Sequence, residues 1–541
     1  MAKNVFRQGK KAFSISANGA FNIKLGPVRI SGSRLEVRLE SGRGIFPLRG
    51  AQLTRPVPND RLPGGGNRVC ASNEQGGLVF TLNVAMPAEG PWMGLCFEIR
   101  NLQRAVIPLQ QVTLLSIPLR KISPIGSAPK PYMLVDSGES GGCAGLHALS
   151  GAKAEDELEA DFGRYFVGLF VPGGSCLFLS SYLGGKTETR FFIQRDRLEV
   201  VAEINGEIAP YGSFATDLLL LGASESINEL LRSYSSLYQG RRRAFEAAHF
   251  HAWSSGDWYE EGLAESDIMD NLEFLKETPW LRDNVKYVIV GRGWERCEGD
   301  WEPNDRFPSL MDTLAGRIND AGFSPGIWIA PLRASRESPL AEKHPEWVLR
   351  PGERARGETP SGQLDYTLPE VRDFVYETLG RLVRWGYKYV WTDFAGVSLD
   401  PKAYKYRGRQ GSPLQCLRSV VTAVRAALGE GVFWVAENAP FSTVAGLCDG
   451  LCIAPPVRPY FSTVLQAART GMYRSYLHGG PWLNCPGLLL VRGPETGLPQ
   501  ALKPGDNVGG AYKRYGWQTG PMLNLQEARL WATWVIASGG I

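Results

Sequence analysis

The spacing of apolar and polar residues changes once along the chain, just after Leu221. Before that point, short segments of alternating or clustered apolar residues are separated by Gly, Pro, Asn and Asp, which is typical of β-strands joined by turns. The segments are RLEVRLE, GLVFTLNVAM, VTLLSIPL, YFVGLFV, CLFLSSYL and RLEVVAEI. Many short strands at this spacing predict an N-terminal β-sandwich.

A single helix is predicted to close this sandwich. Ser224 can act as its N-cap, and four apolar residues fall on one face of the helix. These residues are Ile227, Leu230, Leu231 and Tyr234. The basic run Arg241, Arg242 and Arg243 follows and is interpreted as a solvated linker. We therefore place the N-terminal domain, including its closing helix, at residues 1–240.

From about His249, apolar strands alternate with amphipathic helices, the pattern of βα units around a parallel sheet. VKYVIV, GFSPGIWIAPL, YKYVW and VFWVA are apolar enough for strands that are buried on both faces. We therefore predict a (β/α)8 barrel over residues 241–541, which makes the chain a multidomain β and α/β protein. The final segment LQEARLWATWVIASGG reads as a helix leading to a further strand. Because a closed barrel pairs its last strand with its first, we expect the barrel to be incomplete at its C-terminus.

The clearest βα unit indicates where the chemistry lies. Thr367 is a plausible N-cap, Pro369 stands in the first turn, and the helix ends at Gly386. The strand YKYVW then leads to Asp393, so this carboxylate is predicted at the C-terminal end of a strand, where barrel enzymes hold their catalytic groups. A helix over residues 414–428 and the strand VFWVA bring Glu437 to the same rim.

Composition narrows the functional classes. The chain has 541 residues, 43% hydrophobic and 21% charged, which is typical of a globular protein with more than one domain. A net charge of +4 with scattered basic residues argues against nucleic-acid binding. No apolar run reaches the roughly 18 residues that a membrane helix needs, and the N-terminus has no apolar signal core. We expect a soluble protein without an export signal.

Nine cysteines lie far apart in the sequence, and the closest pair, Cys448 and Cys452, lacks the second pair or histidines of a zinc site. This distribution is typical of reduced cysteines in a cytoplasmic protein. We therefore predict no structural metal, and no sequence feature requires a cofactor. The sequence leaves the oligomeric state open.

Several phrases from about Thr216 onward resemble glycoside hydrolase family 36, the melibiase-type α-galactosidases of clan D. In chain order they are GDWEPNDRFPSLMDTLAGRINDAGFSPGIWIAPL, KHPEWVL, LDYTLPEVRDFVYETLGRLVRWGYKYVWTDF, GLCDGLCIAPP and HGGPWLN. The resemblance also implies an N-terminal β-sandwich before the barrel. It implies retaining hydrolysis of α-linked galactose by two Asp residues, a nucleophile and an acid/base, and Asp393 falls on the nucleophile position.

Five positions depart from the family pattern. Pro456 stands where the family has its acid/base Asp, and Cys452 replaces an Arg that holds the sugar. Gly291 and Arg292 replace an adjacent Asp pair that binds galactose hydroxyls, and Trp391 replaces a Lys. Since charged hydrogen bonds are the strong ones in such sites, these changes predict a substrate that has diverged from plain galactosides.

Other residues are candidates for the remaining roles. Glu437 is the best second carboxylate, either as acid/base or as a contact near the sugar 2-position, and Asn438 follows it. Asp300 and Trp301 are retained from the family phrase GDW, which shapes the sugar subsite. Arg292 suits a carboxylate or sulfate on an acidic sugar. Tryptophans near predicted strand ends are candidates for stacking on a sugar, although core packing is the commoner fate of Trp. They are Trp253, Trp294, Trp328, Trp391 and Trp482.

Three functions fit this pattern, all with a carbohydrate as the partner. The first is a retaining α-glycosidase with Asp393 as nucleophile. The second is a glycosyl transferase of the same family. The third is a sugar-binding barrel that has lost catalysis, which the loss of the acid position favours and the retention of Asp393 opposes.

Overall fold

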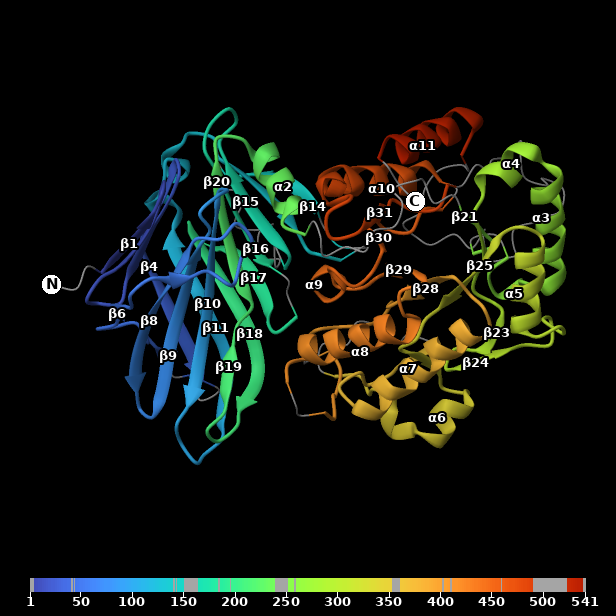
Figure 1. Ribbon diagram of the computed structural model, residues 1–541, viewed down its shortest axis with the longest axis horizontal. Coiled ribbons are helices and arrows are strands. Elements are labelled where there is room, and N and C mark those ends of the chain that lie inside the picture. Colours follow the sequence, from blue (N-terminus) through green and yellow to red (C-terminus); the bar gives the residue numbers. More distant parts are fainter. Residues whose placement is uncertain are drawn as a thin grey trace.

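The computed structural model describes residues 4–39, 42, 44–139, 142, 144–149, 164–182, 185–194, 196–238, 252–256, 259–352, 361–400, 403–408, 411–458, 460–489 and 523–538. The predicted linker at residues 241–243 lies outside these ranges. Figure 1 shows two bodies side by side, one of strands from the N-terminal half and one of strands and helices from the C-terminal half. Within the described ranges, every helix is too short or too polar to cross a bilayer.

Two antiparallel sheets form the N-terminal body. The first has the order β1 (Val5–Gln8), β2 (Lys11–Ile15), β3 (Phe21–Leu25), β4 (Val28–Leu39), β11 (Ile107–Pro118), β18 (Arg197–Ile208) and β17 (Glu188–Gln194), with β5 (Gly44–Ile45) and β12 (Ile122–Ser123) paired to β4. The second has the order β14 (Ala144–Ala148), β13 (Tyr132–Asp136), β15 (Phe166–Phe170), β16 (Cys176–Tyr182), β20 (Leu218–Ser224), β10 (Trp92–Asn101), β9 (Leu78–Met86), β8 (Asn67–Gln75) and β6 (Gln52–Leu53), with β19 (Ser213–Ala215) paired to β10 and β7 (Val57–Pro58) to β8.

The second sheet is covered on both faces. Its inner face shares a core with the first sheet, in which Phe80 and Phe97 meet residues such as Phe13. Its outer face packs on helix α2 (Ile227–Ser236) and on the C-terminal body through Phe178. Burial on both faces explains why β16 is apolar almost throughout, with all seven of its residues buried.

The C-terminal body is built on a seven-stranded sheet in which every pair is parallel. Its order is β21 (Ala252–Ser254), β22 (Tyr287–Val290), β25 (Ser324–Ile329), β28 (Tyr389–Asp393), β29 (Phe433–Glu437), β30 (Gly450–Cys452) and β31 (Leu483–Cys485). In the described part of the chain β21 and β31 are not paired with each other, so the sheet is an incomplete barrel. Two short antiparallel strand pairs lie beyond the ends of β22 and β25. They are β23 (Glu295–Cys297) with β24 (Asp300–Pro303), and β26 (Arg333–Ser335) with β27 (Ser361–Gln363).

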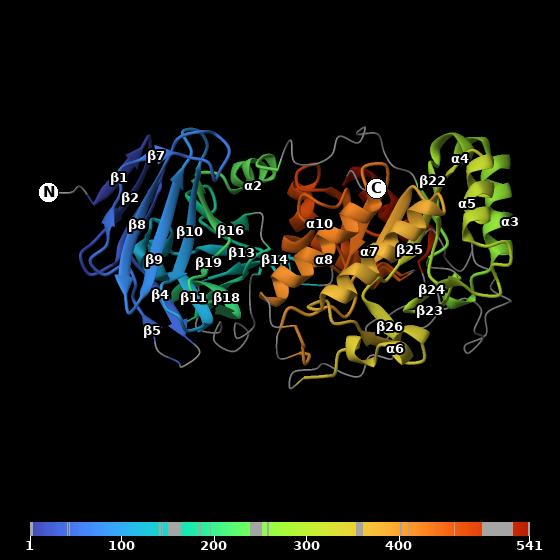
Figure 2. The same ribbon diagram turned by 60° about the horizontal axis from the view of Figure 1, so that its bottom comes forward.

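Helices connect these strands, and Figure 2 shows them ranged along the parallel sheet. They are α3 (Glu265–Glu277), α4 (Pro279–Asn284), α5 (Met311–Asp320), α6 (Pro339–Lys343), α7 (Pro369–Arg384), α8 (Pro413–Leu428), α9 (Phe441–Val444), α10 (Phe461–Arg474) and α11 (Leu525–Ala537). The predicted stop at Gly386 is confirmed, since Gly386 follows α7 with a positive φ angle, and Gly322 follows α5 in the same way.

Two predicted N-caps were wrong. Helix α2 is capped by Ser226, whose hydroxyl accepts the Glu229 N–H, and Ser224 lies at the end of the preceding strand. Helix α7 begins after Leu368 without a side-chain cap. Thr367 instead donates its hydroxyl hydrogen to Asp365. Both helices therefore begin further along the chain than the polar residue that was predicted to cap them.

A buried ion pair joins the two bodies. Arg474, at the end of α10, donates from Nε and Nη2 to the two carboxylate oxygens of Asp136 on β13, at 2.9 and 2.6 Å. Both side chains are fully buried, with 0% exposure. Arg474 Nη1 also donates to the carbonyl of Ile453, in the segment that follows β30. The pair therefore connects the second sheet to the rim of the parallel sheet.

Candidate active site

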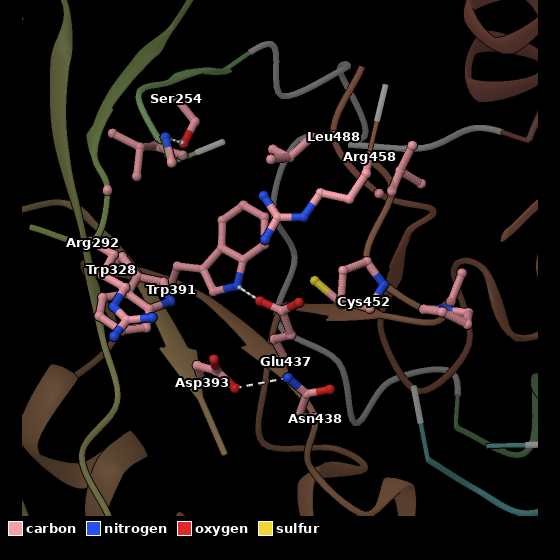
Figure 3. Close-up of a pocket in the computed structure, with 18 of the residues that line it drawn as sticks. Ser254, Arg292, Trp328, Trp391, Asp393, Glu437, Asn438, Cys452, Arg458 and Leu488 are labelled. Carbon is pink, nitrogen blue, oxygen red and sulfur yellow. Dashed lines mark hydrogen bonds between the residues drawn. The ribbon is translucent and has the colours of Figure 1, made fainter. Parts of the chain in front are cut away.

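Two carboxylates lie side by side at the C-terminal edge of the parallel sheet. Strand β28 ends at Asp393 and β29 ends at Glu437, and these two residues are aligned partners in the parallel register. Neighbouring strands lie about 4.8 Å apart, and side chains at the same register position point to the same face. Figure 3 shows both carboxylates at the floor of one pocket.

The pocket is a cavity of about 230 Å³ enclosed by strand ends and by the loops that follow them. Its lining residues are Ser254, Gly256, Ile289, Gly291, Arg292, Trp328, Arg333, Trp391, Asp393, Glu437, Asn438, Cys452, Ala454, Pro455, Pro456, Val457, Arg458, Gly487 and Leu488. Six of the seven parallel strands contribute to it, from β21 to β30. This is the edge at which parallel α/β barrels hold their ligands.

Asp393 is held by two hydrogen bonds to one carboxylate oxygen. Asn438 Nδ2 and the backbone N–H of Ala395 each donate to Oδ1 at 2.8 Å. Asn438 adopts a φ of +54°, a left-handed conformation that asparagine tolerates better than most residues. Removal of the carboxylate from water raises the pKa of Asp393, while these two donors and the charge of Arg333 act in the opposite direction.

Glu437 has a different environment. The indole Nε1 of Trp391 donates to its Oε2 at 2.9 Å, so the residue that replaces the family Lys now orients this carboxyl group. Desolvation, and next the negative charge of Asp393, raise the pKa of Glu437 to about 8. Since two adjacent carboxylates do not ionise together easily, Glu437 is the group of this pair that keeps a proton at neutral pH.

Three arginines line the pocket, and two of them are engaged by glutamates. Arg292 Nη2 lies 3.1 Å from Glu261 and 3.5 Å from Glu298. Arg333 Nε lies 3.2 Å from the buried carboxylate of Glu298. Figure 3 shows the third, Arg458, reaching across the pocket toward the Trp391 ring, and its charge lowers the pKa of Glu437.

Known proteins resemble this chain in sequence and in fold. The family model Melibiase matches residues 290–402, the stretch from the end of β22 to beyond Asp393. The α-galactosidase AgaA of Geobacillus stearothermophilus is 26% identical over 221 residues, which cover 36% of this chain and 29% of AgaA. Residues 290–402 of this chain are therefore similar to the melibiase family.

Other α-galactosidases are similar to this chain over parts of its length. Alpha-galactosidase C of Emericella nidulans is 34% identical over 134 residues, which cover 23% of this chain and 17% of that enzyme. The matched stretch thus spans less than a third of each of these curated relatives. A crystal structure of AgaA A355E with 1-deoxygalactonojirimycin gives a TM-score of 0.65 at 15% identity, covering 99% of this chain and 85% of that one. TtGalA of Thermus thermophilus, solved with p-nitrophenyl α-D-galactopyranoside, gives 0.58 at 21% identity, covering 90% of each chain. These two structures share the fold.

The structure brings most of the predicted site residues together. The predicted residues that line the pocket are Arg292, Trp328, Trp391, Asp393, Glu437, Asn438, Cys452 and Pro456. Four other predicted residues do not line it, namely Trp294, Asp300, Trp301 and Trp482.

Those four residues make structural contacts outside the pocket. Trp294 and Trp301 pack together in the main core with ring centroids 6.2 Å apart, and Trp482 is fully buried with its indole N–H on Asn484. Asp300 forms a 3.0 Å ion pair with Arg296 across its hairpin. These tryptophans follow the commoner fate of a large apolar ring, which is burial. Trp253, the remaining stacking candidate, is half-buried against the same core.

The absence of the family Asp at position 291 has a steric cause. A Cβ atom on Gly291 would lie 2.5 Å from the Gly256 Cα and 2.7 Å from the Gly256 nitrogen. Since these atoms are backbone, no side chain fits without displacing the end of β21. The loss of the first Asp is therefore accompanied by closer packing of two strand ends.

Three functional candidates escaped the sequence analysis: Arg333, Arg458 and Cys485. Arg333 follows β25 by four residues, and the rule that strand ends carry function would have found it. Cys485 ends β31, which the sequence patterns marked only weakly. Arg458 lies in a loop after β30, and no local pattern indicates that its side chain enters the pocket.

Proposed function

We propose that this protein is a retaining α-glycosidase of the α-galactosidase type, with Asp393 as nucleophile and Glu437 as proton donor. The observation that carries the proposal is the pair of adjacent carboxyl groups at the ends of β28 and β29, where the surroundings raise the pKa of Glu437 to about 8. A retaining mechanism requires two such groups about 5 Å apart. Neighbouring parallel strands, about 4.8 Å apart, support that separation.

Each carboxyl group then has a defined task. Asp393 attacks the anomeric carbon and forms a covalent glycosyl ester, while Glu437 gives its proton to the leaving oxygen. The ionised Glu437 next takes a proton from water, the water oxygen attacks the anomeric carbon, and Asp393 is released. Trp391 holds Glu437 in place, and Asn438 holds Asp393. In this scheme Glu437 replaces the family acid, whose position is Pro456.

The substrate is proposed to be an α-linked sugar that differs from a plain galactoside. AgaA and TtGalA have been solved with raffinose and stachyose, respectively. In this chain, Gly291, Trp391 and Cys452 replace charged sugar contacts by small or apolar ones. Arg292 and Arg458, which both line the pocket, are the candidates for binding an anionic substituent.

Two alternatives use the same pocket. A glycosyl transferase would follow the same first step, with a second sugar in place of water. A sugar-binding barrel without catalysis is favoured by the absence of a carboxylate at Pro456. We further propose that the chain divides into a β-sandwich domain, residues 1–240, and an incomplete (β/α)8 barrel, residues 241–541, and that it works in the cytoplasm.

Leaving-group dependence tests the proposal. Wild type and Glu437→Gln are compared on neutral and acidic α-glycosides that carry either nitrophenyl or alkyl leaving groups. General acid catalysis is worth about 10² to 10⁴ in rate. Glu437→Gln is therefore expected to lose that factor on alkyl glycosides and much less on nitrophenyl glycosides, which need little protonation. Equal losses on both would exclude Glu437 as the acid, and no turnover of any glycoside by folded wild type would favour the binding protein.

A further inference from the structure

Two cysteines lie side by side at the ends of β30 and β31, and one of them, Cys452, lines the pocket. Cys452 ends β30 and Cys485 ends β31, and they are aligned partners in the parallel register. Neither forms a disulfide in the structure. Their side chains belong to one apolar cluster with Trp391 and Leu483, and their exposed fractions are only 4% and 3%.

The strand geometry allows these sulfurs to be joined. Aligned residues on neighbouring strands lie about 4.8 Å apart, within the 4.4–6.8 Å between Cα atoms that disulfides span. Side chains at aligned positions of parallel strands point to the same side of the sheet, so the two sulfurs lie next to each other. The Cys452 thiol donates a hydrogen bond to Cys485, which lowers the pKa of Cys485, while burial raises the pKa of Cys452.

A small reagent can reach this pair through the pocket. Cys452 lines the 230 Å³ cavity, and Figure 3 shows its sulfur beside Glu437. Thiolate character and access together decide which cysteines react with peroxides. The pKa of Cys485 is the lowered one, and its hydrogen-bonded neighbour Cys452 lines the cavity, so a peroxide that enters the cavity lies next to the pair. Cys96 and Cys176, which are equally buried in the second sheet, do not line this cavity.

We propose that Cys452 and Cys485 are a redox-active dithiol, which hydrogen peroxide converts into a disulfide in the pocket wall. The Cys485 thiolate attacks one peroxide oxygen, the O–O bond breaks, and the departing hydroxide takes a proton to become water. The sulfur of Cys452 then attacks the resulting sulfenic acid at Cys485. The S–O bond breaks, and the oxygen leaves as a second water with the Cys452 proton. Two thiols are oxidised and one peroxide is reduced.

Oxidation also changes the charge beside the proposed proton donor, a consequence that rests on the proposed function. The negative charge of Cys485 is one of the groups that raise the pKa of Glu437. A disulfide removes that charge, so the pKa of Glu437 falls. The basic limb of the pH–rate profile is then expected to move to lower pH in the oxidised protein and to return after reduction with dithiothreitol.

Disulfide mapping tests the dithiol without any need for turnover. The full 541-residue chain is treated with stoichiometric peroxide, unfolded in N-ethylmaleimide, digested and analysed by mass spectrometry. We expect a cross-linked peptide pair containing Cys452 and Cys485, reversed by dithiothreitol, while Cys96 and Cys176 remain alkylated as internal controls. In Cys485→Ser, Cys452 is expected to stay alkylated, because no partner thiolate reacts first.

Recovery of both Cys452 and Cys485 as alkylated thiols in the wild type would overturn the proposal. Separate sulfinic acids without a cross-link would overturn it as well. If the Cys485→Ser chain fails to fold, the wild-type map alone decides, because it contains both the reactive pair and the control cysteines. A mapped disulfide in a protein without glycosidase activity would refute the proposed function and leave the dithiol intact.

Discussion

Glu437→Gln is expected to stabilise the protein, and to do so more at neutral than at acidic pH. The pKa of Glu437 is raised from 4.5 to about 8, so the folded protein holds a proton that the unfolded chain releases once the pH exceeds 4.5. Stability therefore falls as pH rises between these two values. Each pH unit corresponds to about 1.4 kcal/mol, so the interval from 4.5 to 7 amounts to about 3 kcal/mol. Solvent contact at the pocket floor reduces this to about 2 kcal/mol.

The assay is chemical denaturation of wild type and Glu437→Gln at pH 5 and pH 7, followed by tryptophan fluorescence. The gain from the substitution is predicted to grow by about 1.5 kcal/mol between the two pH values, because glutamine has no proton to release. Glu377→Gln, which removes an exposed carboxylate from α7, is the matched control and is expected to show no such growth. A gain from Glu437→Gln that is the same at both pH values would show that Glu437 is ionised in the folded state, and would refute its role as proton donor.

Three further substitutions test the surroundings of the site. Asn438→Ala removes a donor that lowers the pKa of Asp393, so the acidic limb of the pH–rate profile is expected to move to higher pH; an unmoved limb would contradict this. Asp136→Asn leaves the buried guanidinium of Arg474 without its counter-ion and is expected to cost about 3–5 kcal/mol of unfolding free energy, whereas a loss below about 1 kcal/mol would show that the pair is dispensable. Gly291→Asp, which restores a family residue, is expected to lower the melting temperature by several degrees because its Cβ meets backbone; a melting temperature equal to wild type would refute the steric argument.

The sequence was most informative where a residue's position follows from strand periodicity alone. The apolar strand before Asp393 and the one before Glu437 placed both carboxylates at one rim, and the structure confirms the strand ends. It was least informative about which aromatic rings face the pocket: Trp294 follows β22 by four residues, just as the lining residue Arg333 follows β25, yet Trp294 and Trp301 are both buried in the core. Their burial depends on the hairpin that folds back over the core, which local patterns do not specify.

Contacts between segments that lie far apart in the sequence also could not be predicted from local sequence patterns. The alignment of Cys452 with Cys485 depends on the register between β30 and β31, which thirty residues separate in the sequence. Arg458 reaches the pocket because its loop is tied down by Thr463, whose hydroxyl bonds both the nitrogen and the carbonyl of Arg458. These placements become visible only in the folded structure, because the apolar periodicity of one segment does not specify which other segment packs against it.

Chemical rescue at Asp393 tests the central claim most directly. Wild type and Asp393→Ala are assayed on nitrophenyl α-galactoside and on a panel of neutral and acidic nitrophenyl α-glycosides, with and without azide. The account predicts turnover of at least one glycoside by wild type, loss of that turnover in the variant, and recovery in azide with formation of the β-glycosyl azide, because the small anion attacks from the face that Asp393 vacates. Turnover by Asp393→Ala at the wild-type rate, without azide, would contradict the assignment of Asp393 as the nucleophile.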